Sequence, residues 1–325
     1  MGVVFHHAAL STNSFASEKI PAALSSLLDL GYLGVDFFFV LSGFIILNSH
    51  YNDAGGLTSA KAYFLKRLVR IFPPYLPVSI LMLVAYVALP NLSSGNRQEL
   101  SLVSSLLLLP SNNPPALSVA WTLVHEMMFY IFFLVYFVNK RLFVAAASAW
   151  VVLIVLFGFV LPIEPSNAFA RVMIKPINLE FICGMICAYV WRTCRKGDRI
   201  AVALLVAGIV LLILLARGEP AERFVFGIAF SLIVLGGAML DVGGRFSIPR
   251  TAVLLGDASY SIYLVHNPLV SITSRLVRSL GTHSSWGLML VVGVGASVLL
   301  GVAYHKAFEK PSVKFIRRRV SLSAA

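Results

Sequence analysis

The sequence predicts an all-α protein, a polytopic transmembrane helical bundle with nine full spans and a truncated first span. Two observations lead to this prediction. The 325-residue chain has a mean hydropathy of +0.86, with 58% hydrophobic and 12% charged residues, which is more apolar surface than one water-soluble core of this length buries. Its apolar runs are about 17 to 25 residues long, the length that crosses about 30 Å of hydrocarbon as a helix.

Each expected span is an apolar run that is bounded by Pro, Gly or basic residues. The nine full spans are expected near residues 31–49, 74–90, 117–138, 142–162, 173–191, 199–216, 223–240, 252–272 and 285–305. Residues 1–10 form a tenth apolar segment that is only half long enough to cross a bilayer. No stretch between the spans is long enough to fold alone, so we predict one integral membrane domain over residues 1–325.

The basic residues are distributed as in a membrane protein, although the formal net charge of +12 also raises the possibility of a nucleic-acid partner. If the loop after residue 49 faces the cytoplasm, 18 of the 26 Lys and Arg residues lie on the cytoplasmic side, in agreement with the positive-inside rule. These residues lie within 61–70, 140–141, 192–199, 245–250 and 306–319. We therefore predict a multi-pass protein of the cell inner membrane that contacts the lipid bilayer, with a cytoplasmic C-terminus and no nucleic-acid partner.

The three cysteines predict neither a disulfide nor a metal site. Cys183, Cys187 and Cys194 lie in or just after one expected span, at its cytoplasmic end, where disulfides do not persist. Cys183 and Cys187 share a helix face, but no third or fourth ligand lies near them in the sequence. We interpret them as small apolar side chains and predict no metal and no bound cofactor.

Ionisable side chains within the expected spans point to function, because a charge near the bilayer centre costs about 2.5 to 3.5 kcal/mol. They are Asp36, Glu126, Glu180, Asp257, His6, His7, His125 and His266. For each residue taken alone, a purely structural role in fixing the packing of helices is an open alternative. Their grouping into motifs favours a functional interpretation.

The first of these motifs is "YLGVDFFFVLSGFIIL", residues 32–47. Asp36 lies about one turn into its helix, and Gly34 and Gly43 allow close approach of a neighbouring helix. Packing alone explains the glycines but not the acid. An acid at this depth is tolerated only where it faces water or a protein partner.

The second motif is "KAYFLKRLVRIFPPYLP", in which Arg67 and Arg70 lie three residues apart on one helix face. A break at Pro73–Pro74 is expected to follow. Two guanidinium groups at a membrane face suit a phosphate-bearing ligand such as coenzyme A or a nucleotide. The alternative is that both arginines only obey the positive-inside rule.

The third motif, "SVAWTLVHEMMFYIFF", places Trp121, His125 and Glu126 in the first turns of another span. Trp121 is also explained as an anchor at the membrane interface. Glu126 has no such simple explanation.

The fourth motif, "GDASYSIYLVHNPLV", spaces Tyr260, Tyr263 and His266 three residues apart. These side chains form a polar seam along one helix face. Such a seam faces protein or a cavity, not lipid.

Six segments together resemble the acyltransferase-3 family, membrane O-acyltransferases that modify cell-envelope sugars. They are "VVFHHA", "GVDFFFVLSGFII", "KRLVRIFPPY", "WTLVHEMMFY", "SYSIYLVHNP" and "YHKAFEKP", and they occur in the family's order between residues 3 and 311. The resemblance implies that an acyl group, commonly acetyl, moves from acyl-CoA (acetyl-CoA) as donor substrate to a hydroxyl of a cell-surface or exported polysaccharide, a glycolipid or a secreted small molecule.

The resemblance also implies an essential histidine in the first span, which falls on His6, with His7 as the less favoured alternative. A neutral imidazole accepts a proton near pH 7, so this residue would serve as general base for the attacking hydroxyl. Asp36 or Glu126 would orient the imidazole and stabilise its charged form. The expected substrate-binding residues are Arg67, Arg70, Trp121, Tyr260, Tyr263 and His266.

Two features leave other interpretations open. Family members carry a basic residue upstream of the histidine, and this chain begins too late to contain it. Together with the short first span, this absence predicts that Met1 is an internal methionine of a longer protein. The rival functions are a membrane transporter of a small polar solute, although the two halves show no internal symmetry, and an inactive relative that scaffolds glycan assembly.

Overall fold

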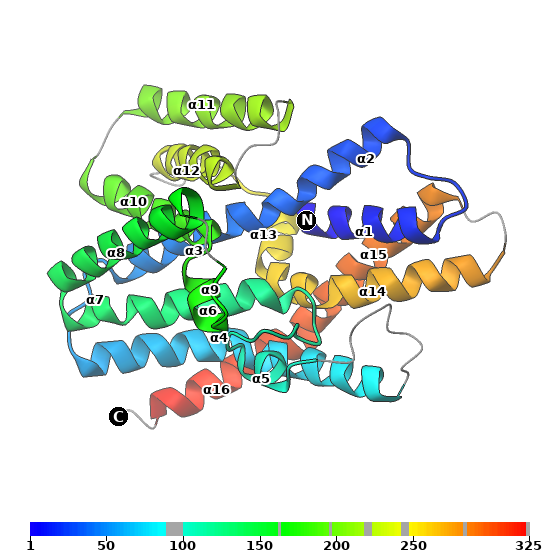
Figure 1. Cartoon of the computed structure of the whole chain (residues 1–325), viewed down its shortest axis with the longest axis horizontal. Coiled ribbons are helices and arrows are strands. Elements are labelled where there is room, and N and C mark those ends of the chain that lie inside the picture. The colour runs from blue at the N-terminus through cyan, green and yellow to red at the C-terminus, as the bar shows by residue number, and fades with distance from the viewer. Residues whose placement is uncertain are drawn as a thin grey trace. The chain divides into compact units, whose positions relative to one another are not determined.

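The structure, a computed structural model, describes residues 1–88, 100–161, 164–194, 197–217, 223–241, 247–281 and 285–322. Within these ranges every regular element is a helix, which confirms the predicted all-α class (Figure 1). Several positions used in the predictions lie outside the described residues. They are Arg195, Lys196 and Arg245, which were counted as cytoplasmic charges, and residues 89–90 and 162, which end two expected spans.

The chain divides into two compact units that alternate along the sequence. The first unit comprises Met1–Gly34, Leu65–Val124 and Ile248–Ala325, and the second comprises Val35–Phe64 and His125–Ser247. The prediction of a single domain over the whole chain stays a prediction.

The first unit is built around the helices nearest the two ends of the chain. Its elements are α1 (Gly2–Phe15), α2 (Ala22–Asp29), the 3-10 turn η1 (Leu30–Leu33), most of α4 (Leu57–Ala88), α5 (Leu102–Leu107), the start of α6 (Ala120–Phe133), α13 (Arg250–Asp257), α14 (Ser259–Ser279), α15 (Trp286–Tyr304), the π-turn η6 (His305–Glu309) and α16 (Lys310–Leu322). Helix α14 packs against both α1 and α15. A Cβ at Gly301 would lie 2.6 Å from Ile262 Cγ1, so α15 approaches α14 only because this residue is glycine.

The second unit packs its helices through glycine contacts and stacked aromatic rings. Its elements are α3 (Gly34–His50, from Val35 on), the start of α4, most of α6, α7 (Val135–Val138), α8 (Lys140–Val155), the π-turn η4 (Leu156–Val160), α9 (Ala168–Met173), the 3-10 turn η5 (Pro176–Asn178), α10 (Leu179–Thr193), α11 (Asp198–Arg217) and α12 (Arg223–Leu240). A Cβ on Gly184 would collide with the Val40 carbonyl oxygen, so α10 and α3 touch backbone to backbone. The Phe181 ring lies 4.5 Å from that of Phe39 and 4.4 Å from that of Phe129.

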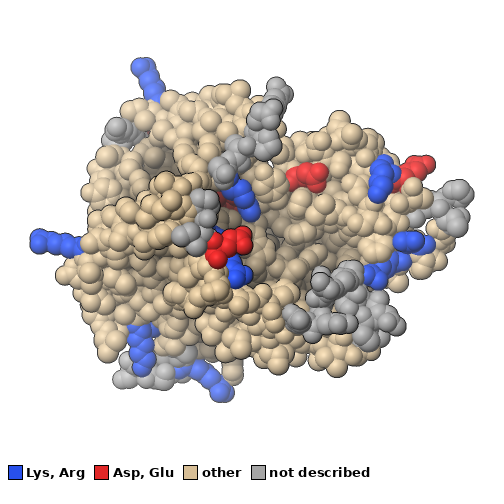
Figure 2. All heavy atoms as spheres, viewed as in Figure 1, with Lys and Arg blue, Asp and Glu red and all other residues tan. Residues whose placement is uncertain are grey.

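Seven helical stretches among the described residues are long and apolar enough to cross a membrane. They are Ala22–His50, Leu57–Ala88, Ala120–Val138, Lys140–Val160, Asp198–Ala216, Arg223–Leu240 and Trp286–Arg319. The expected count of nine full spans is therefore not confirmed, while the multi-pass helical character is. Figure 2 agrees with that character, since residues other than Lys, Arg, Asp and Glu cover most of the visible face.

The two expected spans that fall short do so for different reasons. The span expected near 173–191 corresponds to α10, which has 15 residues. The span expected near 252–272 corresponds to α14, which has 21 residues but carries Ser, Tyr, His, Asn and Arg side chains along its length. Helix α1 has 14 residues, more than the ten expected and still fewer than a full span.

The break expected at Pro73–Pro74 does not occur. Helix α4 runs continuously from Leu57 to Ala88 with prolines 73, 74 and 77 inside it. The three prolines lack the N–H groups that would bond the carbonyls of residues 69, 70 and 73 in a regular helix. Tyrosine hydroxyls bond two other carbonyls of the same stretch. Within the first unit, the Tyr260 hydroxyl donates to the Ile71 carbonyl at 3.0 Å, and the Tyr304 hydroxyl donates to the Pro74 carbonyl at 2.9 Å.

Candidate active site

The paired histidines of α1 point to different partners. His7 Nδ1 lies 2.9 Å from His266 Nε2 on α14, and the two imidazole centroids are 5.0 Å apart. His6 Nδ1 lies 3.6 Å from Asp29 Oδ1, and the His6 ring meets the edge of Tyr32. Successive residues of a helix are about 100° apart around its axis, so neighbouring side chains face different surroundings. His7 therefore faces α14, whereas His6 faces the α2–η1 segment.

The hydrogen bonds around His266 fix which nitrogens carry protons. His266 Nδ1 lies 2.6 Å from the Tyr263 carbonyl oxygen, which only accepts, so this nitrogen carries hydrogen. In the neutral ring, His266 Nε2 is then an acceptor, and the hydrogen shared with His7 sits on His7 Nδ1. The opposite nitrogen of His7, Nε2, is left with its lone pair. This arrangement gives His7 the tautomer of a general base.

The seam expected along α14 packs against protein. The Tyr260 hydroxyl is bonded to the Ile71 carbonyl, as described above. The Tyr263 hydroxyl donates to the Val119 carbonyl at 3.0 Å and lies 2.7 Å from Thr122 Oγ1. His266 is fully buried. The three side chains thus bind neighbouring elements of the first unit, and their exclusion from lipid stays a prediction.

The two arginines of α4 lie one turn apart in the first unit, and both are half-buried. Arg70 Nη1 donates to Glu309 Oε1 at 2.8 Å, and the Arg70 guanidinium lies 5.4 Å from the centre of the Tyr260 ring. Glu309 belongs to the π-turn that joins α15 to α16. Arg70 is therefore held by a carboxylate that comes from the far end of the chain.

The residues expected on α6 divide between the two units. Trp121 belongs to the first unit and is 36% exposed. His125 and Glu126 belong to the second unit and are buried. His125 Nδ1 lies 2.9 Å from Asn178 Oδ1, and Glu126 accepts a short hydrogen bond from the Tyr130 hydroxyl one turn later.

Asp36 is the centre of a buried ionic cluster in the second unit. Arg223 at the start of α12 binds it with both Nε and Nη2, at 3.1 and 2.7 Å from its two carboxylate oxygens. Asp36 is 0% exposed, whereas Arg223 retains 39% of its side-chain exposure. Glu180 of α10 is also fully buried and interacts electrostatically with both. The acid of the first motif is thus matched by a basic partner on another helix.

The structure sorts the predicted site residues into two groups. The first unit contains His6, His7, Arg67, Arg70, Trp121, Tyr260, Tyr263 and His266, whereas the second contains Asp36 and Glu126. No group of three or more His, Cys, Asp or Glu side chains with the geometry of a metal site occurs among the described residues.

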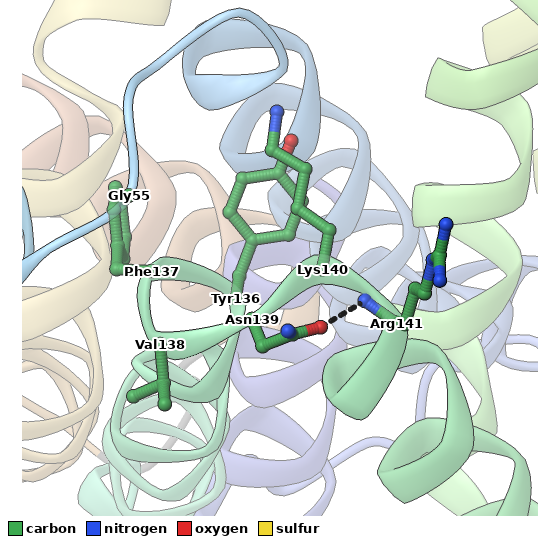
Figure 3. Close-up of a pocket in the computed structure, with 7 residues that line it drawn as sticks. All are labelled: Gly55, Tyr136, Phe137, Val138, Asn139, Lys140 and Arg141. Atoms are coloured by element: carbon green, nitrogen blue, oxygen red, sulfur yellow. Dashed lines mark hydrogen bonds between the residues drawn. The ribbon is translucent and has the colours of Figure 1, made fainter.

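An open pocket lies elsewhere, in the second unit, at the turn between α7 and α8 (Figure 3). It is lined by Gly55 and by residues 136–141, and Asn139 caps α8 there by accepting from the backbone N–H of Arg141 at 2.8 Å. Lys140 crosses the Tyr136 ring and donates to the Tyr51 carbonyl at 2.9 Å. None of the predicted site residues lines this pocket.

Comparison with known proteins decides the family. A sequence profile described as "Acyltransferase domain" matches residues 1–305. The chain belongs to the acyltransferase-3 family. The resemblance drawn from the six sequence motifs is therefore confirmed.

Curated relatives of this acyltransferase-3 chain align along most of it. It is 30% identical over 310 residues to "Exopolysaccharide production protein ExoZ" of Rhizobium meliloti (strain 1021), an alignment that covers 91% of this chain and 94% of ExoZ. It is 26% identical over 348 residues to "Acyltransferase MdmB" of Streptomyces mycarofaciens, covering 96% of this chain and 88% of MdmB. It is 26% identical over 327 residues to "Putative peptidoglycan O-acetyltransferase YrhL" of Bacillus subtilis (strain 168), covering 86% of this chain and 50% of YrhL. No solved structure matches the chain.

The structure of this acyltransferase-3 member adds residues to which the sequence analysis gave no role. Glu309 and His305 stand in the quoted segment "YHKAFEKP", and their separation by one turn was the signal that could have paired them. Glu180 was one of the ionisable residues within the expected spans, and no motif gave it a role. Arg223 and Asn178 gave no signal, because a basic residue and an amide near span ends are ordinary there.

Proposed function

We propose that this acyltransferase-3 member is an integral membrane O-acyltransferase. It moves an acyl group, with acetyl as the first candidate, from acyl-CoA to a hydroxyl of a cell-surface or exported polysaccharide or glycolipid. The family supports acyl transfer. The names of two relatives, one an exopolysaccharide production protein and the other a putative peptidoglycan O-acetyltransferase, support a glycan acceptor.

The observation that carries this proposal is the chain of hydrogen bonds from the Tyr263 carbonyl through His266 to His7. It supplies a neutral histidine whose Nε2 keeps a free lone pair. A hydroxyl acceptor must lose a proton as it attacks, and a positioned neutral imidazole is the side chain suited to take that proton near pH 7.

The proposed transfer is a single acyl exchange. The acceptor oxygen attacks the carbonyl carbon of the thioester while His7 Nε2 takes the hydroxyl proton. The C–S bond then breaks, coenzyme A leaves as a thiolate, and the imidazolium returns the proton to that sulfur. The products are an O-acyl ester and free coenzyme A, and the histidine is regenerated.

The geometry favours His7 over His6 as this base. His7 is oriented by a hydrogen bond to another ring, whereas His6 Nδ1 lies 3.6 Å from the Asp29 carboxylate, which is beyond ordinary hydrogen-bond distance. The sequence-based assignment to His6 stays a prediction. Separate variants of the two residues distinguish the alternatives.

The remaining site residues keep their predicted roles within the proposal. Arg67 and Arg70 would bind the phosphates of the donor, and Trp121 and the rings of Tyr260 and Tyr263 would line the substrate path. The support of the base by Asp36 or Glu126 stays a prediction from the sequence.

The test begins with cells from which the gene has been deleted. Mass spectrometry of their surface and exported glycans should show the loss of one acyl group, and the complementing gene should restore it. Protein in nanodiscs with isolated cell membranes as acceptor source should release coenzyme A from acetyl-CoA without an imposed ion gradient. Unchanged glycans together with no coenzyme A release would contradict the proposal and favour the transporter.

The membrane placement is part of the same proposal. We place the protein in the inner membrane with its C-terminus in the cytoplasm, because the basic segments then lie on the cytoplasmic side. A C-terminal alkaline phosphatase fusion should be inactive, whereas a C-terminal fluorescent protein fusion should be bright.

A further inference from the structure

Glu309 is the centre of a buried polar network in the first unit. Its side chain is 2% exposed. One carboxylate oxygen accepts from Arg70 Nη1 at 2.8 Å, and the other accepts from Ser261 Oγ at 2.6 Å and from His305 Nδ1 at 2.9 Å. A buried carboxylate is costly unless it is paired and hydrogen-bonded, and these three donors meet that requirement.

The network joins three separate parts of the chain. Arg70 lies on α4, Ser261 on α14, and His305 and Glu309 form the two ends of the π-turn η6. A π-turn widens the helix locally, and such turns occur often at functional sites. His305 and Glu309 are four residues apart, and the imidazole of the first contacts the carboxylate of the second. The turn itself therefore helps to orient the carboxylate that binds Arg70.

Arg70 differs from Glu309 in its access to solvent. Its side chain is 41% exposed, whereas that of Glu309 is 2% exposed. A guanidinium has five N–H donors, and Glu309 accepts a hydrogen bond from one of its nitrogens, Nη1. The Tyr260 ring lies under the guanidinium, 5.4 Å from centroid to Cζ, and the Tyr260 hydroxyl is itself fixed to the Ile71 carbonyl. Two contacts therefore hold one side of the guanidinium and leave the rest accessible.

We propose that Glu309, held by Ser261 and His305, is a positioning residue that fixes the Arg70 guanidinium for the phosphates of the acyl donor. The inference rests on the proposed function, in which Arg70 binds those phosphates. A flexible arginine loses side-chain freedom when it binds a phosphate, and an arginine already held in place loses less. Glu309 thus acts on donor affinity through Arg70, without touching the donor.

The test measures coenzyme A binding by isothermal titration calorimetry on the full chain in nanodiscs. Coenzyme A is the probe because it carries the phosphates and needs no acceptor. Glu309→Gln keeps the size of the side chain but removes its charge, and we expect it to raise the Kd up to about tenfold, because Arg70 must then be ordered when the phosphate binds. In an Arg70→Ala background the same substitution should change the Kd less than about twofold, because a residue that acts through Arg70 has no effect without it.

Two further variants complete the design. Glu18→Gln makes the same chemical change at an exposed acid of the same unit, and its Kd should equal that of the wild type. If Glu309→Gln does not yield folded protein, Ser261→Ala removes one support of the carboxylate and keeps both charges, and it should raise the Kd about threefold in the presence of Arg70 only.

The possible outcomes separate the inference from the function on which it rests. A wild-type Kd in Glu309→Gln, or in Ser261→Ala where that variant is needed, overturns the positioning role while coenzyme A binding stands. Equal losses with and without Arg70 also overturn it, because Glu309 would then act by another route. No binding of coenzyme A by the wild-type protein would contradict the proposed donor itself.

Discussion

His7 Nδ1 of α1 meets His266 Nε2 of α14 at 2.9 Å, although 259 residues separate them in the sequence. Packing of α1 along α14 brings them together, and a second polar contact, Ser11 Oγ to Ser274 Oγ at 2.9 Å, lies one turn further along α1 and two turns further along α14. The two contacts fix the register of the helices. The tautomer of His7 therefore depends on helix packing as well as on local sequence.

The first prediction separates the two histidines. His7→Ala should lower acyl transfer about 100- to 10,000-fold, the contribution of a general base, with unchanged expression and membrane insertion. His6→Ala should retain most of the activity, because its ring faces Asp29 and Tyr32. Coenzyme A release with membrane acceptor measures both. The opposite result, a dead His6→Ala and an active His7→Ala, would restore the assignment made from sequence.

The second prediction concerns His266. Replacing it with alanine removes the acceptor of the His7 Nδ1 hydrogen, so the imidazole is free to adopt the wrong tautomer or orientation. We expect kcat to fall about 10- to 100-fold with little change in the donor KM, a smaller loss than removal of the base itself. His266→Asn keeps a polar side chain and should recover part of the rate. A donor KM that rises while kcat stays constant would assign His266 to substrate binding instead.

The third prediction tests the two arginines on the donor. Arg67→Ala and Arg70→Ala should each raise the donor KM about tenfold, more than they lower kcat. The reason is that a lost phosphate contact weakens binding of the donor equally in the ground state and in the transition state. Lysine at either position should rescue only in part, since it lacks the bidentate fork. An unchanged donor KM in both alanine variants would leave the arginines as topology signals.

Much of the architecture was predictable, because backbone polar groups in lipid must be bonded within the protein, and long apolar runs between basic residues therefore form helices. The span near 252–272 shows the limit of that reasoning. Helix α14 carries polar side chains, and those facing α1, α4, α6 and η6 find partners there, which a hydropathy window cannot anticipate. The register between His6 and His7 was equally hidden. Adjacent residues in a short apolar helix give no periodic signal that says which one faces protein.

The pairings of the ionic residues could not be predicted either. Arg70 and Glu309 are 239 residues apart, and Asp36 and Arg223 are 187 apart. Both acids were visible as unusual residues in apolar or motif segments. Arg223 was an ordinary basic residue near a span end, and Arg70 was singled out only as a ligand for phosphate, so only the packing of helices identifies the two pairs.

The fourth prediction concerns the buried pair of Asp36 and Arg223. Arg223→Ala leaves the Asp36 carboxylate buried beside Glu180 with no guanidinium, and we expect a loss of about 2–4 kcal/mol of stability, seen as a lower melting temperature in detergent. The paired change Asp36→Asn with Arg223→Gln removes both charges and should destabilise less than Arg223→Ala alone. A melting temperature unchanged in Arg223→Ala would mean that the pair contributes no stability. Loss of acyl transfer in a fully stable Asp36→Asn protein would favour its predicted role in support of the base.

The last prediction tests the backbone contact between α3 and α10. A Cβ at Gly184 would collide with the Val40 carbonyl oxygen and lie 2.8 Å from the Phe44 nitrogen, and both are backbone atoms that cannot rotate away. Gly184→Ala must therefore push the two helices apart, at a cost of about 1–3 kcal/mol or more for overpacking. The matched control is Gly295→Ala on α15, where no atom lies within 4 Å of the new Cβ and alanine is the better helix former. We expect a lower melting temperature and less folded protein for Gly184→Ala, and an equal or higher melting temperature for Gly295→Ala.

Because α3 carries Asp36 and α10 carries Glu180, the same separation should weaken the buried ionic cluster, so Gly184→Ala and Arg223→Ala combined should cost less than the sum of the two alone. Equal melting temperatures for the two glycine variants would show that α3 and α10 do not touch at this point.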